Sequence, residues 1–347
     1  MSEVEGTASG WQGRARLLVG LVITAVCLVL LLWNIEWGRF WAALRGADYW
    51  WLVPSLVSVG AALWLKVIKW ELLLLPAGRA SHSNLLYSMS VGYLVNTILP
   101  GRLGELARVY MLARVERLSP VAVLSTVAVD RILDVVVLAL LLAAVLPTTH
   151  LPEWVGQSGL VIGAGGIGLL AACLLLAYPW GQTLFLRLLK AAPAFPGKAS
   201  VERWAEALCL GVQGLRGLGA QARIAGVSVA VWLVTVLTFY FGQLAFHVPA
   251  PPWAAVLVLT LTNLGMVVPS SPGYVGVYHY LVVLALVAYG VEKEVALGFA
   301  VVIHLVGLLP VGLLGAFALW RWGLSLMGWR YAASEGGAAS IRAPDVR

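Results

Sequence analysis

Charged residues are scarce in this chain: they make up 11% of its 347 residues, whereas 61% are hydrophobic. Soluble globular domains carry charges at about a quarter of their positions. The composition therefore excludes an ordinary soluble domain and indicates an integral membrane protein. The excess of 23 basic over 16 acidic residues predicts no nucleic-acid partner, because the basic residues follow the ends of apolar runs.

Cysteine and catalytic motifs are also sparse. Cys27, Cys173 and Cys209 lie far apart and form no CxxC pair, which argues against a disulfide framework or a cysteine metal site. The sequence contains no phosphate-binding P-loop and no Ser-His-Asp arrangement. His279 and His304 do not follow a metal-ligand spacing. We therefore expect no enzyme activity, no cofactor and no metal ion.

Long apolar runs dominate what is present, and a helix needs about 20 apolar residues to cross a bilayer. The runs fall at about 15–34, 49–68, 84–100, 119–147, 157–179, 223–247, 253–269, 274–291 and 295–322. Six of them reach that length. The runs at about 84–100, 253–269 and 274–291 fall short of it, and each borders a break rich in proline and glycine.

Basic residues predict how these runs cross the membrane, because cytoplasmic loops are rich in Lys and Arg. In the favoured arrangement 19 basic residues lie on the cytoplasmic side: Arg14, Arg16, Lys66, Lys69, Arg79, Arg102, Arg108, Arg114, Arg117, Arg187, Lys190, Lys198, Arg203, Arg216, Arg223, Arg321, Arg330, Arg342 and Arg347. Arg39, Arg45 and Lys293 lie on the other side, and Arg131 lies inside an apolar run. We expect a multi-pass protein of the cell inner membrane with both termini in the cytoplasm.

This asymmetry places both ends of residues 80–118 inside and both ends of residues 248–294 outside. Each segment is then a re-entrant helical hairpin, and the two enter from opposite faces, as in transporters built from inverted repeats. The predicted fold is an all-α polytopic membrane bundle of about six full spans plus these two hairpins, in one domain over residues 1–330. Eight or nine simple spans are the alternative. A cytoplasmic loop with an amphipathic helix is expected at about 180–222, and a disordered cytoplasmic tail at 331–347.

The first hairpin is interrupted by Pro100 and Gly101. Backbone that leaves the helix at membrane depth needs protein or a water-filled cavity to satisfy its N–H and C=O groups. A helix that begins near Arg102 would carry Glu105 and Arg108 one and two turns along. The N-terminus of such a helix attracts anions.

The second hairpin has a matching break between Asn263 and Gly276. There Ser270 or Ser271 can cap a helix with Pro272 at its first position. Glycines leave the backbone open to a ligand or a neighbouring helix; those at the two breaks are Gly101, Gly104, Gly273 and Gly276. Two matched breaks favour a binding site over ordinary kinks between packed helices, which are the alternative explanation.

Three charged residues, Asp130, Arg131 and Asp134, fall inside the run at about 119–147. Asp130 and Asp134 share a helix face, and Arg131 reaches Asp134 at i,i+3. Ionised groups inside a span cost about 2.5–3.5 kcal/mol each, so they need a partner or a role. An ion-pair network that holds the first hairpin against this helix is one explanation, and direct contact with substrate is the other. The candidate partners in that network are Arg102, Glu105 and Arg108.

The run Asn96-x-x-x-Pro100-Gly-Arg-x-Gly-Glu-x-x-Arg108, followed by Asp130-Arg-x-x-Asp134, resembles the lysylphosphatidylglycerol synthase transmembrane region, also called the flippase-like family. Pro269-Ser-Ser-Pro-Gly-x-x-Gly276 is similar to the Pro-x-x-x-Gly signature of that family. The resemblance covers about residues 15–325. Many members carry Glu at the position of His279.

The resemblance implies handling of a membrane lipid with an anionic or sugar-phosphate headgroup, either a phospholipid or a polyprenyl-phosphate-linked one. We expect lipid translocation, with the phosphate between the two hairpin helix N-termini, assisted by Arg102 and Arg108. The alternatives are a non-translocating accessory subunit or enzyme of lipid-linked glycan or phospholipid synthesis, and a small-anion transporter. A lipid-modifying enzyme is a candidate partner. The soluble aminoacyl-transfer domain of the full synthase is missing, so lysine transfer by this chain alone is not expected.

The candidate substrate-binding residues are those at the two breaks and in the charged run: Asn96, Pro100, Gly101, Arg102, Gly104, Glu105, Arg108, Asp130, Arg131, Asp134, Asn263, Ser270, Ser271, Gly273, Gly276 and His279.

Overall fold

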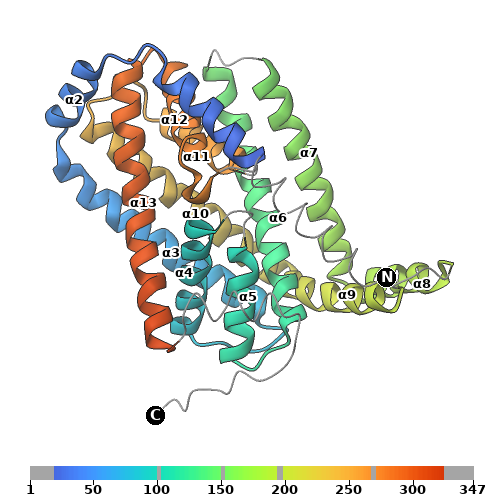
Figure 1. The fold of residues 1–347 in the computed structure, drawn as a ribbon. Coiled ribbons are helices and arrows are strands. Elements are labelled where there is room, and N and C mark those ends of the chain that lie inside the picture. The colour runs from blue at the N-terminus through green and yellow to red at the C-terminus, as the bar shows by residue number, and fades with distance from the viewer. Residues whose placement is uncertain (1–18, 100–102, 150–152, 194–197, 267–270, 324–347) are drawn as a thin grey trace, which may run out of the picture.

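The computed structural model describes residues 19–99, 103–149, 153–193, 198–266 and 271–323. Within these ranges all regular secondary structure is helical (Figure 1), which confirms the all-α prediction. Several predicted features lie outside the described residues: Pro100, Gly101, Arg102, Ser270 and the tail 331–347.

Three helices are long and apolar enough to cross a membrane. They are Tyr49–Leu74, which joins the 3-10 turn η1 (Tyr49–Trp51) to α3 (Leu52–Leu74), α10 (Leu218–Ala245) and α13 (Lys293–Arg321). Two bent pairs raise the number to five if each is one span: Val19–Leu32 turns by 88° into α2 (Trp37–Gly46), and Val161–Leu176 of α7 (Glu153–Leu176) turns by 101° into α8 (Pro179–Ala191).

The sixth predicted span corresponds to α6 (Pro120–Val145), which continues into the 3-10 turn η2 (Leu146–Thr148). Its 26 residues are sufficient in length at about 1.5 Å of rise per residue. It carries three charged residues, Asp130, Arg131 and Asp134, so its composition is less apolar than that of a typical membrane span. Three single helices and two bent pairs therefore correspond to five of the six predicted spans.

The segment predicted as the first hairpin forms two short helices, α4 (His82–Ile98) and α5 (Gly104–Val115), which pack against each other. Ser81 caps α4, because its hydroxyl accepts a hydrogen bond from the Asn84 N–H at 3.2 Å. The helix predicted to begin near Arg102 begins at Gly104. α13 packs along α4, so this pair of helices is held inside the bundle.

The second predicted hairpin consists of α11 (Ala254–Gly265), the 3-10 turn η4 (Pro272–Tyr274) and α12 (Val277–Val287). The predicted helix start at Pro272 is wrong, because Pro272 begins only this one turn. Gly273 and Gly276 have φ of +67° and +86°, values that favour glycine and stop a helix. The α-helix begins at Val277, and the Ser271 hydroxyl donates to the Val275 carbonyl at 2.9 Å rather than capping a helix.

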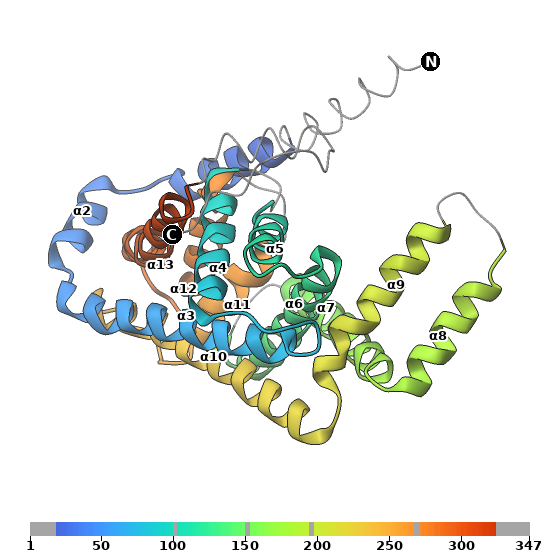
Figure 2. The same ribbon diagram turned by 90° about the horizontal axis from the view of Figure 1, so that it is seen from below.

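Residues 179–215 form two helices rather than the single amphipathic helix expected in this loop. α8 and α9 (Lys198–Val212), the latter followed by the turn η3 (Gln213–Leu215), make a helical hairpin that projects from the bundle (Figure 2). Trp180, Leu184 and Leu188 are exposed on α8, and their spacing of four residues places them on one stripe.

The long helices bring the two broken segments together. α3 packs along α10, α13 packs on α4 and α12, and α11 packs on α6 and α12. The largest buried apolar cluster includes residues of α10, α11, α12 and α13. A second cluster around Trp70 joins α3, α4, α5 and α6. η4 contacts α4, where Gly273 lies against Thr97. The described residues that flank the two breaks therefore lie beside each other.

Candidate functional site

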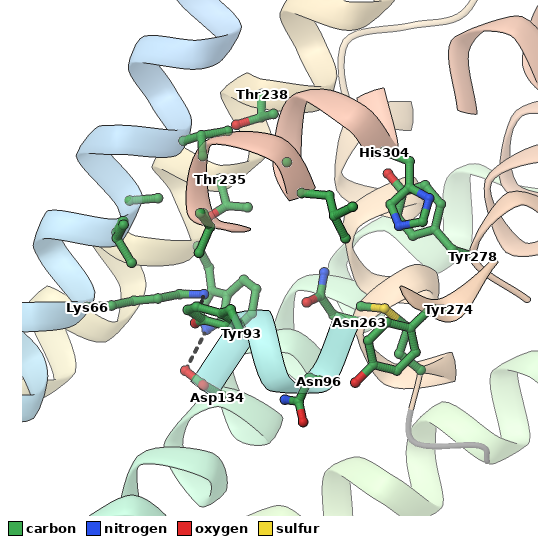
Figure 3. Close-up of a pocket in the computed structure, with 18 of the residues that line it drawn as sticks. Lys66, Tyr93, Asn96, Asp134, Thr235, Thr238, Asn263, Tyr274, Tyr278 and His304 are labelled. Atoms are coloured by element: carbon green, nitrogen blue, oxygen red, sulfur yellow. Dashed lines mark hydrogen bonds between the residues drawn. The ribbon is translucent and has the colours of Figure 1, made fainter. Parts of the chain in front are cut away.

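A cavity of about 420 Å³ lies between the two broken segments and the long helices (Figure 3). Aliphatic and aromatic side chains form most of its wall. Its polar and titratable side chains are Lys66, Tyr93, Asn96, Thr97, Glu105, Arg131, Asp134, Thr235, Thr238, Asn263, Tyr274, Tyr278 and His304. Apolar walls with a few convergent polar groups are typical of sites for organic ligands.

A network of buried ion pairs borders this cavity and centres on Lys69 of α3. The Lys69 ammonium lies 2.6 Å from Asp130 Oδ1 and 2.6 Å from Asp134 Oδ1. The side chains of Lys69, Asp130 and Asp134 are 1%, 2% and 6% exposed. Trp232 of α10 also donates its indole N–H to Asp134 Oδ1 at 3.1 Å. The network therefore joins α3, α6 and α10.

Two arginines complete the network. Arg108 of α5 lies 3.3 Å from Asp130 Oδ2 and 2.8 Å from Glu105 Oε2. Arg131 Nη2 lies 2.8 Å from Asp130 Oδ2 and 3.1 Å from Asp134 Oδ2. Three cations thus face three carboxylates, so no net charge is buried, and removal of one partner would leave another uncompensated. The predicted network between α5 and α6 is present, with Glu105 and Arg108 as partners.

Only part of this network reaches the cavity. Glu105, Arg131 and Asp134 line it, and the side chains of Glu105 and Arg131 are 30% and 37% exposed. Arg108 is 3% exposed, and its guanidinium lies 5.0 Å from the centroid of the Trp70 ring. Arg108 therefore stands behind the cavity wall and does not line the space in which it was expected to contact a phosphate.

Lys66 enters the cavity from α3, one turn before Lys69 (Figure 3). Its ammonium donates to the Tyr93 hydroxyl at 3.2 Å and lies 5.2 Å from the centroid of the Trp232 ring. Among the described residues no carboxylate lies within ion-pair distance of Lys66. Aromatic faces attract a cation without neutralising it, so Lys66 keeps a charge with which it can bind an anion.

Side chains and glycines close the first break. Asn96 near the end of α4 accepts the Gly104 N–H through Oδ1 at 2.7 Å, which satisfies a donor at the start of α5. A Cβ atom on Gly92 would lie 2.8 Å from the Gly104 carbonyl oxygen. Glycine at both positions therefore lets α4 and α5 approach closely, while Asn96 satisfies one backbone donor at the start of α5.

The second break is held by neutral groups. The Ser271 N–H donates to Thr24 Oγ1 at 3.0 Å, which ties the break to the helix Val19–Leu32. The Gly276 N–H donates to His279 Nδ1 at 3.4 Å across the start of α12. His279 also lies 5.0 Å, between ring centroids, from His304. The helices α11, η4 and α12 contain no Asp, Glu, Lys or Arg.

The predicted site residues divide into two groups. Asn96, Glu105, Arg131, Asp134 and Asn263 line the cavity. The other described ones support its walls without lining it: Gly104, Arg108, Asp130, Ser271, Gly273, Gly276 and His279. No cluster of metal-ligating side chains occurs in the described part of the chain.

Sequence reasoning missed several cavity residues: Lys66, Tyr93, Trp232, Tyr274, Tyr278 and His304. Lys66 and Lys69 were interpreted only as markers of the cytoplasmic end of a span. Their spacing of three residues on one face of an apolar run was the signal that could have identified them, because charges inside a span need partners.

Comparison with known proteins fits this membrane architecture. No solved structure matches this chain significantly. The glycosyltransferase AglD of Haloferax volcanii is 24% identical over 334 residues, which cover 84% of this chain and 52% of that protein. The chain therefore spans about half the length of this curated relative. The family model described as "Lysylphosphatidylglycerol synthase TM region" matches residues 17–315, which include both broken segments and the cavity. The chain therefore belongs to the lysylphosphatidylglycerol synthase transmembrane-region family.

Proposed function

We propose that this membrane protein translocates a lipid whose headgroup carries a phosphate. The headgroup occupies the cavity, and the acyl or prenyl chains stay in the bilayer. The observation that carries the proposal is Lys66, a cation without a carboxylate partner among the described residues, in a largely apolar cavity. Arg131 adds a partly exposed guanidinium to the same space. A phosphate there would gain charge-assisted hydrogen bonds from both cations.

Side-chain cations, rather than the two helix N-termini, are the main phosphate contacts in this proposal. Asn96 already accepts the Gly104 N–H at the start of α5, and His279 accepts the Gly276 N–H at the start of α12. Each helix end therefore has fewer free donors than its sequence suggests. The positive ends of both helix dipoles still favour an anion nearby.

A translocation assay tests the proposal. The purified full chain is reconstituted in liposomes that contain fluorescent phosphatidylglycerol, and dithionite reports movement of the headgroup between leaflets. We expect Lys66→Gln to slow translocation at least about tenfold, Lys66→Arg to retain it, and Lys190→Gln, on exposed α8, to leave it unchanged. No movement of phosphatidylglycerol or of a polyprenyl-phosphate sugar by the wild type would contradict the proposal, as would normal movement in Lys66→Gln.

The membrane arrangement is part of the same proposal: two re-entrant hairpins of opposite orientation in the cell membrane, with both termini in the cytoplasm. The two pairs of short helices beside the cavity support it, as does the basic asymmetry, which is 16 to 3 when Lys66, Lys69 and Arg108 of the cavity and the buried network are not counted. In a chain without its native cysteines, single cysteines at Ala80 and Ser119 should be labelled from the cytoplasm, and those at Ala250 and Glu292 from outside. If the two ends of either segment are labelled from opposite faces, a bundle of simple spans replaces this arrangement.

A second candidate function is that of an accessory subunit or enzyme of lipid-linked glycan synthesis, which binds the lipid without moving it. The relative named as a glycosyltransferase favours this class. We place it second because the sequence contains no catalytic motif, and we propose that the chain by itself is not an enzyme. Lipid binding without translocation in liposomes, or transfer of a radiolabelled sugar by the purified chain, would reverse this order. Transport of a small soluble anion ranks third, because most of the cavity wall is apolar.

A further inference from the structure

Two asparagines bring neutral hydrogen-bonding groups into the cavity, one from each broken segment (Figure 3). Asn96 uses its Oδ1 atom to accept the Gly104 N–H, so its Nδ2 donors are the part left for a ligand. Asn263 does the opposite, because its Nδ2 atom donates to the Leu259 carbonyl at 2.9 Å. Its Oδ1 atom makes no hydrogen bond within the described ranges. The cavity thus offers an amide donor from α4 and an amide acceptor from α11.

A cavity that offers both a donor and an acceptor matches one class of headgroup better than others. A hydroxyl both donates and accepts a hydrogen bond, whereas an ammonium only donates and a trimethylammonium does neither. Ammonium-bearing headgroups would also place a positive charge near Lys66, which has no carboxylate within ion-pair distance among the described residues and would repel it. The pair of asparagines and the cations together favour a headgroup that combines hydroxyls with a phosphate.

The rest of the cavity suits a ring. Figure 3 shows Lys66 at one end, Asn96 and Asn263 between, and Tyr278 with His304 at the other end. The rings of Tyr278 and His304 stack with centroids 4.2 Å apart, which fixes a flat aromatic surface. The C–H faces of a sugar or cyclitol ring can pack on such a surface while its hydroxyls reach polar groups at the edge.

We propose, building on the function above, that the lipid headgroup is a polyhydroxylated ring joined through a phosphodiester, such as a glycosyl or inositol phosphate. Its phosphate binds at Lys66 and Arg131, and its hydroxyls bind at Asn96 Nδ2 and Asn263 Oδ1. This deepens the proposed function, because it names which phosphate-bearing headgroup the cavity selects.

The test compares two lipids with equal charge and identical acyl chains. Phosphatidylinositol and phosphatidylmethanol are both phosphodiesters with one negative charge, but only the first carries hydroxyls. We expect the detergent-solubilised full chain to bind phosphatidylinositol at least about tenfold more tightly, measured by native mass spectrometry. Asn263→Leu should remove that preference and leave phosphatidylmethanol binding unchanged. The matched control is Thr262→Val on the same helix, whose buried hydroxyl bonds only to backbone carbonyls of α11 and does not line the cavity.

The outcomes separate this inference from the function on which it rests. Equal binding of the two lipids by the wild type would overturn the hydroxyl preference and leave lipid translocation intact. Binding of neither lipid, together with no headgroup movement in liposomes, would overturn both. Tighter binding of phosphatidylethanolamine than of phosphatidylinositol would overturn the proposed headgroup class. The wild-type comparison decides the matter even if Asn263→Leu fails to fold.

Discussion

Each of the two broken segments beside the cavity has short helices on both sides of a break, but their chemistry differs. α4 and α5 pack beside six ionised side chains of α3, α5 and α6. α11, η4 and α12 contain no Asp, Glu, Lys or Arg, and their break is held by hydrogen bonds that the Ser271 and Gly276 N–H groups donate to Thr24 and His279. A similar interruption of the helix can therefore be stabilised electrostatically on one side and by neutral groups on the other. In the proposals above, the cations that bind the phosphate, Lys66 and Arg131, lie on α3 and α6, whereas the second segment contributes only uncharged groups such as Asn263 to the headgroup.

The difference also predicts unequal sensitivity to substitution. Buried charges that lose a partner are costly, whereas a lost neutral hydrogen bond costs about 0.5–1.5 kcal/mol net. Substitutions at the first break should therefore reduce the stability of the folded protein more than comparable substitutions at the second. Four variants test this, from the largest expected effect to the smallest.

The largest effect is expected for Lys69→Met. The change leaves Asp130 and Asp134 in α6 with two arginines and no ammonium, at sites 2% and 4% exposed. Breaking a buried ion pair by removing one partner costs about 3–5 kcal/mol. We expect a strong loss of folded protein in fluorescence-detected size-exclusion chromatography. The matched control is Lys66→Met, one turn away on the same helix. It removes no ion-pair partner from any carboxylate of the network and should fold normally.

A double variant sharpens this prediction. Lys69→Met combined with Asp134→Asn removes one charge of each sign and should recover part of the folded protein. Equal yields for Lys69→Met and Lys66→Met would show that the network does not hold the first break, and the contrast between the two breaks would fail.

Part of this comparison could be predicted from the sequence. Pro100 and Gly101 marked the first break, and the cluster Asp130, Arg131 and Asp134 required partners inside the membrane. Local chemistry was sufficient for these features because each is encoded within a few neighbouring residues. The interactions of Glu105 and Arg108 followed from the same argument.

Other parts depended on contacts between residues far apart in the chain. The sequence pattern predicts Lys69 at the end of a span. In the structure α3 continues to Leu74, and the Lys69 ammonium is buried against α6. The α-helix does not begin at Pro272 as predicted, because Gly273 adopts a positive φ. The sequence permits this conformation at a glycine but does not require it. The stacking of Tyr278 on His304 joins α12 to α13 and has no local signature.

The second effect is expected for Gly104→Ala. The new Cβ would meet the Gly92 carbonyl oxygen and the Asn96 side chain, so α4 and α5 would have to separate. Overpacking of this kind costs about 1–3 kcal/mol. Gly60→Ala, in α3 with nothing within 4 Å of the new atom, is the control and should not lower the melting temperature. Equal melting temperatures for the two variants would mean that the close approach of α4 and α5 contributes little.

The third variant, Asn96→Ala, removes the side chain that accepts the Gly104 N–H. Loss of a capping side chain costs about 0.5–2 kcal/mol, and a lower melting temperature in detergent would show it. Asn263→Ala, at the corresponding place before the second break, should affect the melting temperature less, because its amide bonds to a carbonyl of its own helix. The reverse order would mean that the second break depends more on its asparagine than the first.

The smallest effect is expected at His279, three residues into the start of α12. Its Nδ1 atom accepts the Gly276 N–H at 3.4 Å, which is the reciprocal bond that a Glu or Gln makes at the same position of a capping box. His279→Gln should keep an acceptor there and leave the melting temperature unchanged. His279→Leu has a similar volume and no acceptor, so it should lose about 0.5–1.5 kcal/mol. If both variants have the same melting temperature as the wild type, this hydrogen bond contributes nothing to stability. The second break would then depend on the Ser271–Thr24 bond and on the positive φ of its glycines.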